Sequence, residues 1–165
     1  MQIAKMRIPT AAEWIQLLKV TDGDDTIMHW REMFSFGRNE NPDFGTDRAI
    51  LGYYEPDYYR CPYTGSDNVN VGLRPAFEAQ SFNDLPDGAI VVAGSLLMNG
   101  LPLRVPTNPV WNGDIPEFIP DAKLELRPAL DGSAYQVRAI KAGNVLIADR
   151  VLVASITWSE AVNIS

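Results

Sequence analysis

The chain has 165 residues, and its 46% of hydrophobic and 21% of charged residues are typical of a protein with a packed core, not of a disordered or fibrous one. Its 14 basic and 21 acidic residues give a net charge of −7, which argues against direct binding of nucleic acid and against attachment to a membrane surface. The longest apolar run, at 89–93, is too short to span a membrane, and we expect no signal peptide at the N-terminus. The single cysteine, Cys61, leaves no internal disulfide and fits a reducing compartment.

The first predicted element is a helix that begins after Thr10. Thr10 and Glu13 have the spacing of a capping box, and Pro9 directly before them cannot lie inside a helix. Asp22-Gly23 is a stop signal, and the residues after it predict a second, shorter helix over 24–29. Within the first helix, apolar residues recur at the spacing of one buried face, at Ala11, Trp14, Ile15 and Leu18.

Between residues 30 and 72 the hydrophobic pattern is irregular, with Gly, Asn, Asp and Pro every few residues and aromatic rings between them. Disordered segments lack such aromatic residues, so we expect an ordered loop region that its rings hold in place. Residues 79–87 have the composition of a linker. We therefore place a boundary there, between a first part, 1–78, and a second part, 79–165, which either forms a second small domain or continues the first and completes its sheet.

Antiparallel strands are predicted for the second part. Turn-forming pairs at Asn99-Gly100, Asp131-Gly132 and Gly143-Asn144 separate runs that are rich in apolar residues, at 89–98, 101–105, 122–127, 134–140, 145–147 and 151–158. Pro102 limits its strand to an edge or a bulge, because proline cannot donate a ladder hydrogen bond. Helices in the first part and strands in the second predict an α+β fold.

Two segments of the first part resemble one protein family. Residues 7–14, RIPTAAEW, are similar to the helix start of the formylglycine-generating-enzyme-like branch of the C-type-lectin fold. Residues 71–77, VGLRPAF, look like the strand that closes this fold, with Leu73 in place of the usual Phe, and residues 48–53 resemble its middle segment without the second Arg. The resemblance covers about residues 6–78. It implies a compact C-type-lectin-like domain, to which the β-rich region 79–165 is added.

The enzymes of this family oxidise a cysteine with a pair of active-site cysteines, and this chain has only Cys61. His29 is the only imidazole, and nothing in the spacing pairs it with Cys61. We therefore expect no catalytic residues and no enzyme activity, and we expect His29 to be packed and hydrogen-bonded. Arg74 lies in an apolar strand, so it needs a buried carboxylate or backbone carbonyl as acceptor.

Calcium is the metal that the resemblance suggests, because lectin members of the wider fold bind sugar through it. Residues 39–43, NENPD, and 111–114, WNGD, carry the oxygen ligands that calcium prefers, and Asp22, Asp24 and Asp25 form another acidic group. All of these are also ordinary turn or capping sequences. We therefore expect no cofactor and no metal ligand.

The best candidate for a binding site is a tyrosine-rich segment, since five of the six tyrosines lie between residues 53 and 63. Tyrosine combines a large apolar ring with a polar tip, and loops rich in Tyr and Asn are typical of recognition surfaces. The alternative is that these rings form the core of the loop region. We expect the following residues to bind the ligand: Tyr53, Tyr54, Tyr58, Tyr59, Arg60, Tyr63, Asn68 and Asn70.

These features predict a non-catalytic module that binds a protein or a glycan, similar to the binding proteins of phages and mobile elements. One alternative is a small acidic inhibitor of a host nucleic-acid-binding enzyme, whose basic groove it would fill. Another is a structural role, in which strand edges pair to form a homo-oligomer or a virion component. The expected location is the cytoplasm or the virion.

Overall fold

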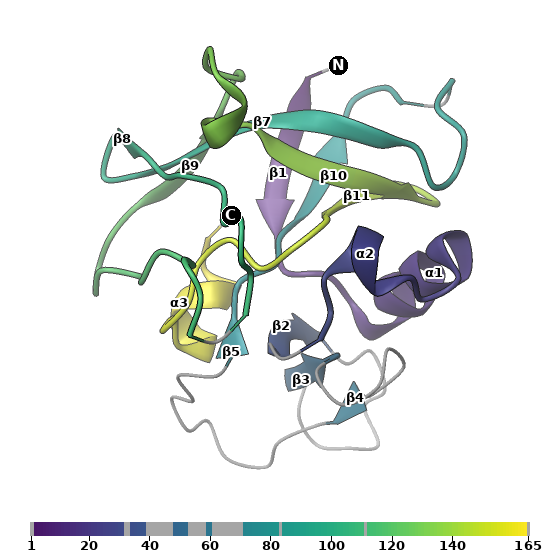
Figure 1. Ribbon diagram of the computed structural model, residues 1–165, viewed down its shortest axis with the longest axis horizontal. Helices are drawn as coiled ribbons and strands as arrows, with labels where there is room; N and C mark the ends of the chain where they lie inside the picture. Colours follow the sequence, from purple (N-terminus) through teal and green to yellow (C-terminus); the bar gives the residue numbers. More distant parts are fainter. Residues whose placement is uncertain are drawn as a thin grey trace.

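The computed structural model describes residues 2–31, 34–38, 48–52, 59–60, 71–82, 84–110 and 112–164. Figure 1 shows a main, mostly antiparallel sheet that curves until it is nearly barrel-shaped, with a smaller sheet at one end. Two helices lie on one side of the molecule and a third lies on the other. The mixed α+β architecture predicted from the sequence is confirmed.

The two N-terminal helices follow the prediction. α1 (Ala11–Thr21) begins with the expected capping box, in which the Glu13 amide donates to Thr10 Oγ1 at 3.1 Å and the Thr10 amide donates to the Glu13 carboxylate at 2.8 Å. α1 ends at Asp22, whose φ of 52° is left-handed. α2 (Asp25–Met28) follows and ends at His29, with φ 47°.

The main sheet has seven strands in the order β1-β6-β11-β10-β7-β8, and β9 also pairs with β7. All of the neighbouring pairs are antiparallel. β6 pairs with β1 on one side and with β11 on the other, so strands from both parts of the chain belong to one sheet. The strand bounds are β1 (Ile3–Arg7), β6 (Ala76–Ala79), β7 (Ile90–Met98), β8 (Leu101–Pro102), β9 (Leu124–Arg127), β10 (Val137–Ala142) and β11 (Val145–Ala148).

Two of the predicted turns join neighbouring strands. Asn99 and Gly100 have φ of 52° and 81°, as a type I′ turn requires, and connect β7 to β8. Gly143, with φ 64°, lies in the turn between β10 and β11. After Asp131-Gly132 the chain instead forms a short 3-10 turn, η2 (Ser133–Tyr135), so the strand predicted at 134–140 begins only at Val137.

The smaller sheet has the order β4-β3-β2-β5. Its strands are β2 (Phe34–Arg38), β3 (Arg48–Leu51), β4 (Tyr59–Arg60) and β5 (Val71–Gly72). The pair β2 and β5 is parallel, and the other pairs are antiparallel. We expected loops over residues 30–72; the described part of this region instead contributes these four strands.

The segment 71–77, predicted as one strand, is divided between the two sheets. β5 ends at Gly72, Leu73 makes an isolated bridge to Val153, and β6 begins at Ala76. Pro75 has no amide hydrogen and interrupts the ladder at this point. Arg74 therefore lies at the junction of the two sheets.

The strand predicted at 151–158 is wrong. Within it, only Val153 and Ala154 form isolated bridges, and the chain then enters α3 (Trp158–Val162). Thr157 and Glu160 form a second capping box: the Glu160 amide donates to Thr157 Oγ1 at 3.2 Å, and the Thr157 amide donates to the Glu160 carboxylate at 2.8 Å. The same Thr-x-x-Glu signature that identified α1 was therefore present for α3.

Two groups of buried side chains form the core. In one group, Trp14 and Leu17 from α1 pack with Ile140 of β10, and each is at most 1% exposed. In the other, Phe77 and Leu146 lie at the centre of the main sheet. The apolar face predicted for α1 is thus buried at Trp14, whereas Ile15 is 50% exposed.

Candidate functional site

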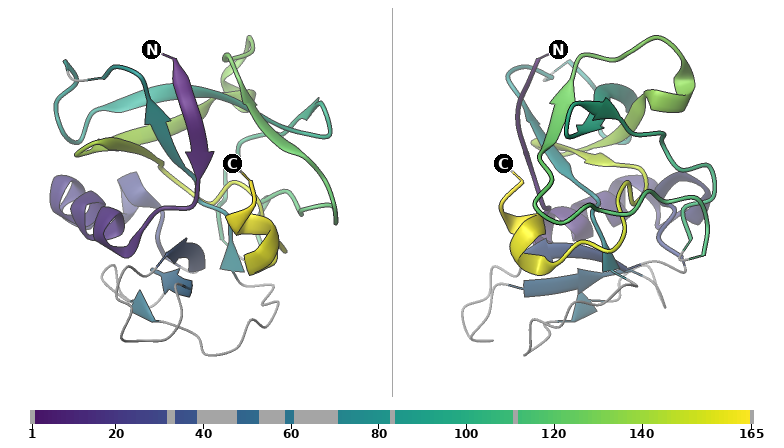
Figure 2. Two further views of the ribbon diagram at one scale, coloured as in Figure 1. Left: turned by 180° about the vertical axis from the view of Figure 1, so that it is seen from behind. Right: turned by 90° about the vertical axis from the view of Figure 1, so that its left-hand side faces the viewer.

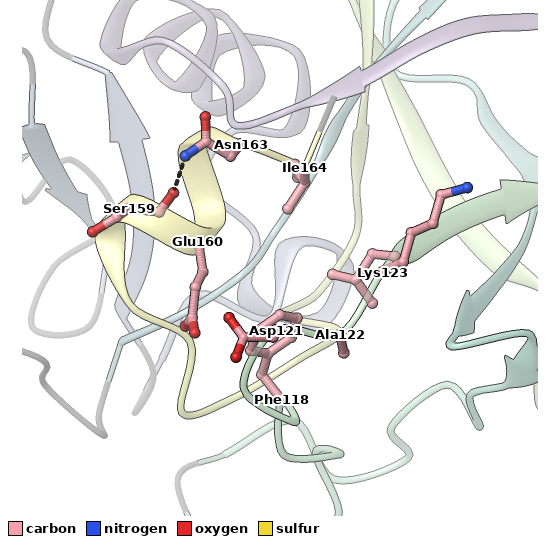
Figure 3. A pocket seen from close by; sticks show the side chains of 9 residues that line it. Phe118, Asp121, Ala122, Lys123, Ser159, Glu160, Asn163 and Ile164 are labelled. Carbon is pink, nitrogen blue, oxygen red and sulfur yellow. Dashed lines mark hydrogen bonds between the residues drawn. The ribbon is translucent and has the colours of Figure 1, made fainter.

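A groove of about 570 Å³ lies between α3 and the segment 118–124, and we call it the α3 groove (Figure 3). Its apolar side chains come from Phe118, Ala122, Leu124 and Ile164. Ile119, next to Phe118 in the chain, is 55% exposed and adds apolar surface nearby. Polar side chains complete the lining, from Asp121, Lys123, Ser159, Glu160 and Asn163.

Backbone pairing brings the two walls of the groove together. The Phe118 amide donates to the Ala154 carbonyl at 2.8 Å, and the Ala154 amide donates to the Pro116 carbonyl at 2.8 Å. The segment before β9 is thereby fixed beside the residues that lead into α3. On α3 itself, Asn163 Nδ2 donates to the Ser159 carbonyl at 2.7 Å, which orders the end of this short helix.

The charged side chains at the α3 groove are Asp121, Glu160 and Lys123. Figure 3 shows the carboxylates of Asp121 and Glu160 directed toward one another from opposite walls. Glu160 keeps one oxygen on the Thr157 amide. Lys123 Nζ lies 2.5 Å from the carboxylate of Glu125, which partly neutralises its charge. The groove therefore combines apolar surface with an acidic rim.

A second groove of about 370 Å³ adjoins the first, because Leu124 and Ile164 line both. It runs between residues 3–6 of β1 and residues 124–127 of β9. Figure 2 (left) shows the C-terminal end of the chain between the lower ends of these two strands. The two grooves form one continuous surface on the side of the molecule that carries α3.

A buried polar network surrounds His29. Arg150 donates to both carboxylate oxygens of Asp149, at 2.8 and 2.9 Å, and to the Pro106 carbonyl at 2.8 Å. Its Nη2 also lies 3.3 Å from His29 Nε2. Asp149 is only 2% exposed, and its backbone carbonyl accepts a hydrogen bond from Arg74 at 3.1 Å. The expectation of a hydrogen-bonded His29 is confirmed.

The charges in this network follow from burial and pairing. Burial lowers the pKa of His29, and the positive charge of Arg150 lowers it further. Burial also lowers the pKa of Arg74 to about 10, so this side chain stays charged at neutral pH. The hydrogen bonds to Asp149 raise the pKa of Arg150. His29 is thus neutral and accepts from Arg150, and it lines a depression of about 340 Å³ with Asp25, Arg31 and residues 107–110.

Most of the predicted ligand-binding residues lie outside the described residues: Tyr53, Tyr54, Tyr58, Tyr63, Asn68 and Asn70. Tyr59 and Arg60 form β4, of which the structure describes the backbone pairing with β3. Cys61 also lies outside the described part. The tyrosine-rich binding surface therefore stays a prediction.

Two of the candidate calcium ligands, Asp114 and Asp24, use their carboxylates on nearby groups of the chain. The Asp114 carboxylate accepts from the Thr107 amide at 2.9 Å, the Thr107 hydroxyl at 2.7 Å and the Asn108 amide at 2.8 Å. Asp22 caps the end of α1, and Asp24 caps the start of α2. Residues 39–43 lie outside the described part. Among the described residues, no group of three His, Cys, Asp or Glu side chains is placed to hold a metal ion.

The sequence pattern did not indicate the α3 groove. The Thr157-Glu160 signature could have predicted one wall, α3 itself. The opposite wall, 118–124, reaches α3 through a bridge between Glu117 and Ala154, for which the sequence carries no local signal.

Comparisons of the chain with protein-family models, with curated proteins and with solved structures found no match. In the described part of the chain, no helix has the length and apolar character needed to cross a membrane.

Proposed function

We propose that this protein is a non-catalytic binding module that recognises a segment of another protein in the α3 groove. The observation that carries the proposal is the groove itself, in which the half-buried side chains of Ala122 and Ile164 lie between two walls that backbone hydrogen bonds hold in place. Grooves of this kind bind apolar side chains, while a few polar groups at the rim fix orientation.

The acidic rim defines the chemistry of the segment. Asp121 and Glu160 face each other at the groove, and a basic side chain placed between them would relieve their mutual repulsion. The segment therefore carries an apolar anchor next to a Lys or Arg. A protein is favoured over a glycan because the groove offers aliphatic surface from Ala122 and Ile164, with Ile119 exposed beside it.

Selection from a displayed library of random twelve-residue peptides tests this proposal. Selected peptides should contain an apolar residue beside Lys or Arg, and they should shift the amide NMR signals of residues 118–124 and 158–164. The double variant Asp121→Asn, Glu160→Gln should weaken binding about tenfold, because two charged partners are lost. Glutamine at position 160 can still accept a hydrogen bond from the Thr157 amide, so α3 keeps its cap.

The matched control removes two charges elsewhere, at the exposed residues Asp84 and Asp131, by replacing both with Asn. This control should bind the selected peptides as the parent protein does. Two results would contradict the proposal: selected peptides that leave the groove signals unchanged, or equal losses in the two double variants. Light scattering of the protein alone detects a homo-oligomer. An oligomer built through α3 would also contradict the proposal.

A further inference from the structure

The main sheet does not close. β1 has one partner strand, β6, and β9 has one partner strand, β7. Each of these two strands therefore has one edge without a partner strand. The structure describes both strands in full, and no backbone hydrogen bond joins β1 to β9. Unpaired edges present amide and carbonyl groups that an additional strand can use.

The groove between these strands runs along their free edges. Successive side chains of a strand point to opposite faces of its sheet. All of residues 3–6 and all of residues 124–127 line the groove, so it cannot lie on one face alone. We call it the β1–β9 seam.

Strand direction allows an added strand here. Every step along β1-β6-β11-β10-β7-β9 is antiparallel, so β1 and β9 run in opposite directions along the sheet. A strand in the seam would be antiparallel to one of them and parallel to the other, and both pairings form regular ladders. An added strand that pairs with both β1 and β9 would close the sheet and leave neither edge exposed at this position.

The charge of the seam indicates what kind of strand fits. Lys5 is exposed and has no ion-pair partner among the described residues. Glu125 is already paired, with Lys123 at 2.5 Å and with Arg127 at 3.0 Å. The lining of the seam thus has two basic residues, Lys5 and Arg127, and one acidic residue, Glu125, and it is net positive in a chain whose net charge is −7. Acidic side chains on an added strand would complement Lys5, because Arg127 already pairs with Glu125.

A second copy of this chain is a poor occupant, because the same basic edge residues would face each other. We infer that the β1–β9 seam binds an extended, acidic segment of another protein by strand addition, with main-chain hydrogen bonds to β1 and β9. This inference rests on the proposed binding function and adds the backbone geometry and charge of the partner.

The test uses a blocked octapeptide of alternating Val and Glu as its probe, and a Val and Lys octapeptide for comparison. The acidic probe should bind at least about tenfold more tightly at low salt, and the preference should shrink in concentrated salt. Binding should slow amide exchange in residues 3–6 and 124–127. An acidic probe that is N-methylated at alternate residues should not bind, because it cannot complete the ladders.

Lys5→Glu should remove the preference for the acidic probe. Lys19→Glu, an exposed position in α1, changes the net charge equally and should leave the preference intact. The inference is overturned if the seam amides gain no protection, if the N-methylated probe binds equally well, or if the protein alone dimerises through these edges.

The α3-groove double variant keeps the two proposals separate. Asp121→Asn, Glu160→Gln should still bind the octapeptide in the seam. If library peptides bind the α3 groove while the octapeptide fails, this inference is wrong and the proposed function stands. If the octapeptide protects the seam while no library peptide reaches the groove, the proposed function is wrong in its choice of site.

Discussion

Arg74 Nη2 donates a hydrogen bond to the carbonyl oxygen of His29 at 2.7 Å, which ties the junction between the two sheets to the end of α2. Arg74 Nη1 donates to the carbonyls of Met28 and Asp149 as well. Its guanidinium carbon lies 5.2 Å from the centre of the Trp14 ring. The expectation that Arg74 has buried carbonyl acceptors is confirmed.

Arg74→Ala should lower the free energy of unfolding by about 3 kcal/mol or more, because it leaves buried carbonyls without a donor. Chemical denaturation measures this loss. The comparison is Arg31→Ala, which removes an exposed guanidinium 4.8 Å from the Trp30 ring and should cost less than about 1 kcal/mol. Similar losses in the two variants would contradict a structural role for Arg74.

The protein should become less stable as the pH falls from 7 to 5. Because burial lowers the pKa of His29 in the folded state, the unfolded chain takes up a proton at a higher pH than the folded chain does. Stability is therefore lost from the ordinary imidazole range, near about 6.5, down to the lowered folded pKa. Thermal melts at several pH values measure this slope.

His29→Asn is the variant for this test, because asparagine tolerates the left-handed backbone at this position, φ 47°. The slope between pH 7 and 5 should become flatter in the variant. An unchanged slope would show that another group causes the pH dependence. Stopping at pH 5 leaves out most of the range in which ordinary carboxylates take up protons.

Gly94→Ala should destabilise the protein by about 3 kcal/mol. A Cβ at this position would lie 2.4 Å from the Arg127 carbonyl oxygen, and φ is 151°. The variant should also separate β9 from β7, which hydrogen exchange at residues 124–127 would detect. Gly132→Ala is the control: its φ is also positive, at 95°, but a Cβ there meets no atom within 4 Å. It should cost about 1 kcal/mol and leave β9 protected.

Thr157→Ala should cost about 1 kcal/mol, because the Glu160 amide loses its hydroxyl acceptor. Amide exchange in α3 should become faster, and peptides selected for the α3 groove should bind more weakly. Thr157→Ser retains the hydroxyl and should restore both properties. If Thr157→Ala changed stability without loosening α3, the capping contact would not be what orders this wall of the groove.

Local signals in the sequence predicted much of the secondary structure. Thr10 and Glu13 located α1, Asn99-Gly100 located a hairpin, and Gly143-Asn144 located another. Each depends on contacts within a few residues, so the sequence is sufficient to identify it. At 151–158 the apolar run predicted a strand although Thr157 and Glu160 have the capping signal of a helix, and this prediction was wrong.

The sequence by itself thus determined the helix caps, the tight turns and the need of Arg74 for buried acceptors. Only the tertiary structure decided that residues 71–77 divide between two sheets, and that β1 and β9 border an open seam. The α3 groove likewise depends on a bridge between Glu117 and Ala154, which are far apart in the chain. The physical reason is that caps and turns satisfy backbone groups locally, whereas an edge or a groove exists only where distant segments pack together.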